Sequence, residues 1–93
     1  MASAVVTIKI MPEGPDVDME AVRAAAESKI DAFVGEQGEK RASIKPIAFG
    51  LNAVEIIFVM DEKLGSTEPL ELEIGKLAGV QSVEVIDVRR AIG

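Results

Sequence analysis

The stretch NAVEIIFVM at residues 52–60 decides the fold class, because apolar side chains occupy both sets of its alternating positions. One set is apolar throughout: Val54, Ile56, Phe58 and Met60. The other set includes Ile57 and Val59. Successive side chains of a strand point to opposite faces of the sheet. Apolar residues on both faces therefore predict a central strand that is covered at least partly on each side.

Two strands are expected earlier in the chain. Residues 4–11 alternate, and one face carries the apolar set Val6, Ile8 and Ile10. This pattern predicts a strand with one buried side. Residues 43–48 form a weaker candidate, because Pro46 lacks a backbone donor and is typical of an edge strand.

The last strand is expected over residues 80–88. Its apolar alternation breaks at Ile86, where a β-bulge would explain the change of face. Between the second and third strands, Phe49 and Gly50 turn the chain in a short hairpin.

Two helices are expected between these strands. The first begins at a cap, Asp16 or Asp18. Its apolar stripe has the 3.6-residue period of a helix: Met19, Val22, Ala26, Ile30 and Phe33. Residues 35–41, with two glycines and four charges, are expected to form a loop.

The second helix is expected to begin at Ser66 or Thr67 and to end near Gly79. Its buried stripe would be Leu70, Ile74 and Leu77, with Leu72 off the stripe and Gly75 inside the helix. A glycine in a helix interior costs about 1 kcal/mol relative to alanine.

The element order is therefore β-α-β-β-α-β, which favours a ferredoxin-like α+β sandwich. Residues 1–93 would form one domain: a four-stranded antiparallel sheet with both helices on one face and the first and third strands in the centre. On the open face, Ile57 and Val59 would form a patch available to a partner or to a second copy of the chain.

The charge balance limits the possible partners. Sixteen acidic and 10 basic residues give a net charge of −6, which argues against non-specific binding to nucleic acid. Residues 1–3 carry no Lys or Arg, so no signal peptide is expected. Apolar runs fall short of the roughly 18–20 residues that a membrane helix needs. The expected location is the cytoplasm, with no membrane contact.

The composition excludes several kinds of site. The chain has no Cys and no His, which removes thiolate sites and the commonest general base. Three Phe are the only aromatic residues, too few for an RNA-stacking sheet. The acidic pairs Asp16/Asp18 and Asp61/Glu62 are interpreted as a helix start and a solvated loop rather than as cation ligands. No catalytic residue, metal site or cofactor is expected.

Four segments, in order and in register, carry a resemblance to a known family. They are VTIKIMP at residues 6–12, PIAFG at 46–50, DEKLG at 61–65, and VQS at 80–82 running to DVRR at 87–90. Together they are similar to the archaeal elongation factor 1-beta family over essentially the whole chain. The chain also resembles the C-terminal exchange domain of longer eukaryotic homologues. The ferredoxin-like fold of that family agrees with the element order.

The resemblance implies a function in protein biosynthesis. A member of this family binds elongation factor 1-alpha, a GTPase, and speeds exchange of GDP for GTP without being an enzyme. In the relatives, a Phe at the hairpin tip docks on the second domain of the GTPase. Phe49, with its neighbours Ala48 and Gly50, corresponds to it.

In the same relatives, a Lys near the C-terminus reaches toward the magnesium site of the GTPase. Arg90 aligns with that residue, and Arg89 is an equal candidate. The inferred topology places Phe49 and the arginines at opposite ends of the sheet.

Without the resemblance, the same residues allow other interpretations. Phe49 fits a core residue at a hairpin, and Arg89 and Arg90 fit a solvated chain end. An alternative function on the same element order is a small-molecule-sensing module of the ACT type. An acylphosphatase-like enzyme would need an Arg after the first strand, and none precedes Arg23.

Overall fold

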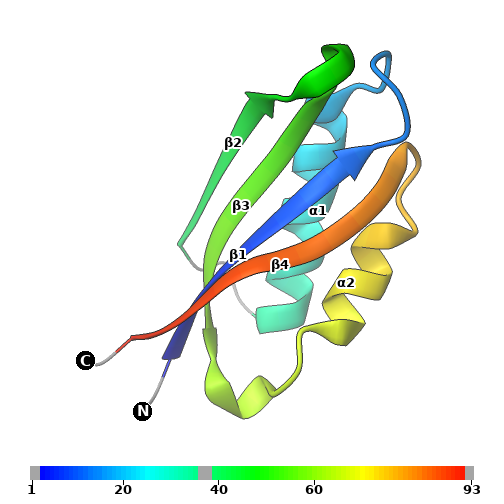
Figure 1. Cartoon of the computed structure of the whole chain (residues 1–93). Helices are drawn as coiled ribbons and strands as arrows, with labels where there is room; N and C mark the ends of the chain where they lie inside the picture. The colour runs from blue at the N-terminus through cyan, green and yellow to red at the C-terminus, as the bar shows by residue number, and fades with distance from the viewer. Residues whose placement is uncertain (1–2, 36–38, 92–93) are drawn as a thin grey trace.

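A single antiparallel sheet with two helices on one face makes up the fold (Figure 1). The computed structural model describes residues 3–35 and 39–91. The elements in chain order are β1 (Ser3–Pro12), α1 (Met19–Val34), β2 (Lys40–Pro46), β3 (Asn52–Asp61), α2 (Glu68–Gly75) and β4 (Val80–Ala91). Short 3-10 turns, η1 (Ala48–Gly50) and η2 (Glu62–Leu64), flank β3.

The strand order is β2-β3-β1-β4, with every neighbouring pair antiparallel. The apolar stretch that predicted a central strand is β3, which pairs with β1 on one side and β2 on the other. The ferredoxin-like arrangement, with the first and third strands in the centre, is therefore confirmed.

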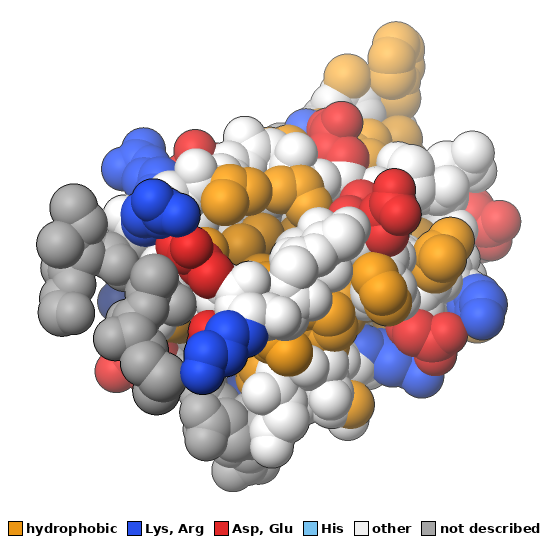
Figure 2. Space-filling model, turned by 90° about the horizontal axis from the view of Figure 1, so that it is seen from below, with side chains coloured by type: hydrophobic (Ala, Val, Ile, Leu, Met, Phe, Trp, Pro, Cys, Tyr) orange, Lys and Arg blue, Asp and Glu red, His pale blue; other side chains and the backbone are white. Residues whose placement is uncertain are grey.

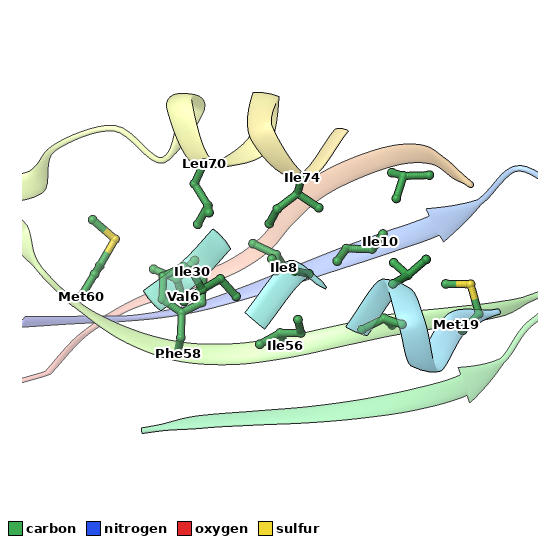
Figure 3. Packing of buried hydrophobic residues seen from close by; sticks show 14 of the residues in the cluster. Val6, Ile8, Ile10, Met19, Ile30, Ile56, Phe58, Met60, Leu70 and Ile74 are labelled. Carbon is green, nitrogen blue, oxygen red and sulfur yellow. The ribbon is translucent and has the colours of Figure 1, made fainter. Parts of the chain in front are cut away.

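The core lies between the sheet and the helices (Figure 3). Central strands β1 and β3 each bury one alternate set of side chains, and Leu70 and Ile74 of α2 point down onto them. The largest fully buried side chain is Phe58 on β3. On the opposite face, Ile57 and Val59 are 41% and 40% exposed, as expected of an open sheet face.

Local contacts explain where the helices begin. Asp18 caps α1, because its carboxylate accepts the backbone N–H groups of Glu20 at 3.1 Å and Ala21 at 3.2 Å. Thr67 is the N-cap residue of α2, while the hydroxyl of the preceding Ser66 accepts the N–H of Glu68 at 3.1 Å.

The structure corrects the expected end of the second helix. Helix α2 ends at Gly75, so this glycine closes the helix instead of lying inside it. The next two backbone N–H groups bond to the carbonyls three residues back, which tightens the chain into a turn. Gly79 then takes a φ of 86° and passes so close to Val17 that a Cβ would lie 2.7 Å from a methyl carbon.

The second strand is also shifted from its expected range of 43–48. It begins at Lys40, whose ammonium group lies 2.7 Å from the Asp31 carboxylate of α1, and it ends at Pro46. Part of the expected loop at residues 35–41 is therefore strand, and its centre, residues 36–38, lies outside the described residues.

The predicted β-bulge at Ile86 is confirmed. Thr7 of β1 pairs with Asp87, and the next residue, Ile8, pairs with Val85, so Ile86 is the extra residue. Strand β4 then continues three residues beyond the expected end, to Ala91. The bulge changes which residues of β4 face the helices, and this change decides the orientation of the two arginines.

Candidate functional site

The turn η1 presents Phe49 to solvent. Its side chain is 94% exposed, and its backbone adopts φ 63° and ψ 29°, in the left-handed region. It is the sole non-glycine residue with positive φ among residues 3–35 and 39–91. That conformation costs a residue with a Cβ roughly 1–2 kcal/mol. The interpretation of Phe49 as a core residue is therefore wrong.

The backbone around the tip explains this conformation. The N–H of Ile47 donates to the carbonyl of Leu51 at 2.8 Å, which closes the loop directly after β2. Gly50 follows Phe49 with a φ of 74°, also left-handed. Two consecutive left-handed residues reverse the chain within this short turn, and the Phe49 ring lies in solvent outside the core. A strained, exposed aromatic residue of this kind is typical of a contact surface.

The two arginines lie at the other end of the sheet, on opposite faces. Arg90 pairs with Ala4, whose side chain belongs to the core face, whereas Arg89 pairs with Val5 on the open face. Directly paired residues share a face. Without the bulge at Ile86 the assignment would be reversed, because Val83 and Val85 set the helix-facing positions before it.

Arg90 is held by a carboxylate from another part of the chain. Its Nε lies 2.7 Å from Oε2 of Glu62, and its Nη2 lies 2.9 Å from Oε1. The hydrogen bond with Arg90 lowers the pKa of Glu62, and the same bond raises the pKa of Arg90. Glu62 was expected to lie in a solvated loop, and no local pattern predicts this contact, because the two residues are 28 positions apart.

Arg89 makes a different and more local contact. Its Nε lies 3.0 Å from Oδ2 of Asp87, two residues earlier on the same strand. The pair is exposed, with 80% of the Arg89 side chain open to solvent.

The candidate contact residues thus form two separate groups. Ala48, Phe49 and Gly50 precede the start of β3, and Arg89 and Arg90 on β4 lie level with its end, with β1 between the two strands. Ten strand residues separate the two ends, which at about 3.3 Å each corresponds to roughly 30 Å. Figure 1 shows the β2–β3 turn at one end and the C-terminal part of β4 at the other.

The arginine end also carries an open hollow of about 580 Å³ between the sheet and the start of α2. Apolar side chains of Ala4, Val6, Met60 and Val88 line it, and the Glu62–Arg90 pair lies at its rim. Figure 2, which views the molecule from this end, shows apolar side chains gathered among charged ones.

Neither a metal site nor a membrane-spanning helix is found among the residues that the structure describes. Among the residues described here, no group of three acidic side chains is arranged to hold a metal ion. Over the same residues, the helices are too short or too polar to cross a membrane.

Comparison with known proteins points to one family. Residues 5–91 match the family model of the EF-1 guanine nucleotide exchange domain. Relatives named Elongation factor 1-beta include that of Methanobrevibacter smithii, 46% identical over 90 residues, which cover 97% of this chain and 98% of the relative. Those of Methanosphaera stadtmanae and Methanothermobacter thermautotrophicus are 41% and 40% identical, with the same two shares covered.

Similarity to solved structures bears on the fold alone. The De novo designed protein Foldit4 has a TM-score of 0.64 at 20% identity, with 98% of each chain covered. BlrP1 BLUF has a TM-score of 0.56 at 16% identity. The match covers 100% of this chain and 57% of BlrP1 BLUF. The family match spans nearly every described residue, and the chain therefore belongs to the elongation factor 1-beta family, which serves guanine nucleotide exchange on a GTPase in translation elongation.

Proposed function

We propose that this chain accelerates the exchange of GDP for GTP on elongation factor 1-alpha by binding alone, with no chemical step of its own. Exchange regenerates the GTP form of the GTPase, which carries aminoacyl-tRNA. The observation that carries the proposal is Phe49, 94% exposed on a strained backbone at the tip of a rigid sheet. Such a side chain is suited to fill a pocket on another protein.

The separation of the two residue groups suggests how binding acts on the nucleotide. Phe49, flanked by Ala48 and Gly50, docks on one domain of the GTPase. Arg90, with Arg89 near it, reaches the nucleotide-binding domain about 30 Å away. A stiff sheet that binds two domains favours one relative orientation of those domains. In that orientation the GTPase binds GDP less tightly.

Accelerated exchange requires a coupling free energy between binding of the factor and binding of GDP. A thousandfold loss of GDP affinity corresponds to about 4 kcal/mol of coupling. Coupling is reciprocal, so rebinding of nucleotide weakens the binding of the factor to the GTPase by the same free energy. One buried aromatic hot spot contributes about 2 kcal/mol or more, and a charge contact supplies part of the rest.

The net charge agrees with this role. At −6, the chain is attracted to a basic protein surface and repelled by phosphate backbones, so it acts on the GTPase without holding RNA directly. We propose that residues 1–93 work as one exchange domain, and that they work in the cytoplasm, where translation elongation takes place.

The test is the release of a fluorescent GDP analogue from elongation factor 1-alpha, followed by stopped-flow fluorescence. The wild-type chain should accelerate release strongly, and Phe49→Ala should lose most of the acceleration. Leu72→Ala is the matched control, because Leu72 is another exposed apolar residue, 66% exposed, on α2 beside β4 at the sheet edge opposite β2. An unchanged release rate with wild type would overturn the proposal and favour a small-molecule-sensing module.

We further propose that any self-association uses the open sheet face. Ile57 and Val59 are the apolar centre of that face, and Arg41 and Asp87 stand at the two ends of the row through Ile57. A second copy, turned about an axis parallel to the strands, would set Arg41 against Asp87. Sedimentation at high concentration tests this; an association that Ile57→Lys leaves unchanged would contradict it.

A further inference from the structure

Glu62 is held in a fixed position at the arginine end. It begins the turn η2 directly after β3, and its backbone carbonyl accepts the N–H of Gly65 at 3.1 Å. The carboxylate of Asp61 accepts the N–H of Lys63 at 2.9 Å, which closes the start of the turn. The Glu62 side chain is 30% exposed, whereas that of Arg90 is 73% exposed. Glu62 is therefore the more enclosed partner of the pair.

Among the described residues, only Glu62 bonds to the Arg90 guanidinium, and it occupies one side of the group. An arginine has five N–H donors in one plane. Glu62 takes the Nε–H and one N–H of Nη2, along one side of the group. Both N–H groups of Nη1 and the second N–H of Nη2 point away from this carboxylate. These outer donors form a second fork, which matches the two oxygens of a carboxylate or a phosphate.

Arg89 lacks this arrangement. Its contact with Asp87 joins Nε to a single oxygen, within one strand and on the open face. Among the described residues, this one bond holds the Arg89 guanidinium, so the group can rotate about it and its outer donors have no fixed direction.

We propose that Glu62 is a positioning residue: it holds Arg90 side-on, so that the outer fork is presented to a pair of oxyanion oxygens on the GTPase–nucleotide complex. The inference rests on the proposed exchange function and specifies which arginine serves it. A lysine at position 90 would direct its single compact charge to Glu62, whereas an arginine keeps a second edge for the partner. Orientation before binding also reduces the side-chain entropy that is lost on contact.

Exchange assays on variants of the pair test the proposal. Glu62→Gln, which keeps the shape and removes the charge, should lower the exchange rate at sub-saturating factor about fivefold. Arg90→Ala should lower it at least as much, and the double variant should be no worse than Arg90→Ala alone. Asp87→Asn is the matched control, because it releases Arg89 in the same way and should change the rate less than about twofold.

A charge reversal separates positioning from a structural role. In the double variant Glu62→Arg with Arg90→Glu, an ion pair can form again, so thermal stability should return to the wild-type value. Exchange should stay low, because the outer fork is no longer attached to residue 90. Recovery of exchange in this variant, or a wild-type rate in Glu62→Gln, would overturn the inference. If wild type itself failed to accelerate exchange, the proposed function would fall instead.

Binding measurements identify the source of the oxygens. If they belong to a carboxylate of the GTPase, Arg90→Ala should weaken binding to the nucleotide-free and GDP-bound forms alike. If they belong to a nucleotide phosphate, the loss should be confined to the GDP-bound form. The first pattern supports the proposal. A loss confined to the GDP-bound form would contradict it, because an arginine that binds a GDP phosphate holds GDP more tightly and opposes its release. Unchanged binding to both forms would also contradict it.

Discussion

At the hairpin end, one aromatic side chain stands in solvent because two consecutive residues take left-handed backbone angles; at the arginine end, a charge is held by a residue 28 positions away. The first arrangement is local and depends on a turn of three residues. The second depends on the whole sheet, since Glu62 follows β3 and Arg90 lies on β4, with β1 between them. A substitution that destabilises the sheet should therefore disturb the Glu62–Arg90 pair before it disturbs the turn η1. A substitution within the turn should leave that pair in place.

The largest effect is expected from the core that joins the two ends. Phe58 is 1% exposed at the centre of β3, so Phe58→Ala should lower the free energy of unfolding by about 3–5 kcal/mol. Urea denaturation measures the change. Val59→Ala, on the open face of the same strand, is the control and should cost less than about 1 kcal/mol. Equal costs at the two positions would contradict the assignment of the faces.

The next effect concerns both ends together. Phe49 and Arg90 lie about 30 Å apart and share no contact, so their contributions to exchange should be independent. The fold-losses of Phe49→Ala and Arg90→Ala should then multiply in the double variant, as measured by release of fluorescent GDP at equal factor concentration. A double variant no worse than Phe49→Ala would show that the two ends do not act as separate contacts.

A smaller effect, opposite in sign, is expected at the tip. Phe49 has φ 63°, which glycine adopts without steric cost. Phe49→Gly should therefore raise the free energy of unfolding by about 1 kcal/mol while it abolishes most of the exchange activity. Urea denaturation beside the exchange assay tests both parts. A loss of stability would mean that the ring packs on the protein.

The smallest effect is the pH dependence of the arginine end. The pKa of Glu62 is lowered in the folded chain, chiefly by the hydrogen bond from Arg90, from an ordinary value of 4.5. Its ionised form thus stabilises the fold above the unfolded pKa, and that contribution is lost as the pH falls through the folded pKa. The difference in melting temperature between wild type and Glu62→Gln should be present at neutral pH and should shrink as the pH falls below the ordinary value of 4.5. A difference independent of pH would contradict the ion pair.

Much of the fold could be predicted because it depends on patterns that are read locally. The alternation of β3 predicted a central strand, and the break at Ile86 predicted the bulge. Boundaries were less accurate where contacts between distant elements decided them: Asp31 of α1 holds the first residue of β2, and the close approach of Gly79 to Val17 follows the early end of α2.

The sequence by itself determined the element order, the buried set of each central strand and the position of the hairpin tip, because hydrophobic periodicity and turn residues act over a few positions. Only the tertiary structure decided that Phe49 is exposed, that Arg90 and not Arg89 lies on the helix side, and that Glu62 holds it. These features depend on which backbone angles, faces and distant groups the packed sheet brings together. No local pattern contains that information.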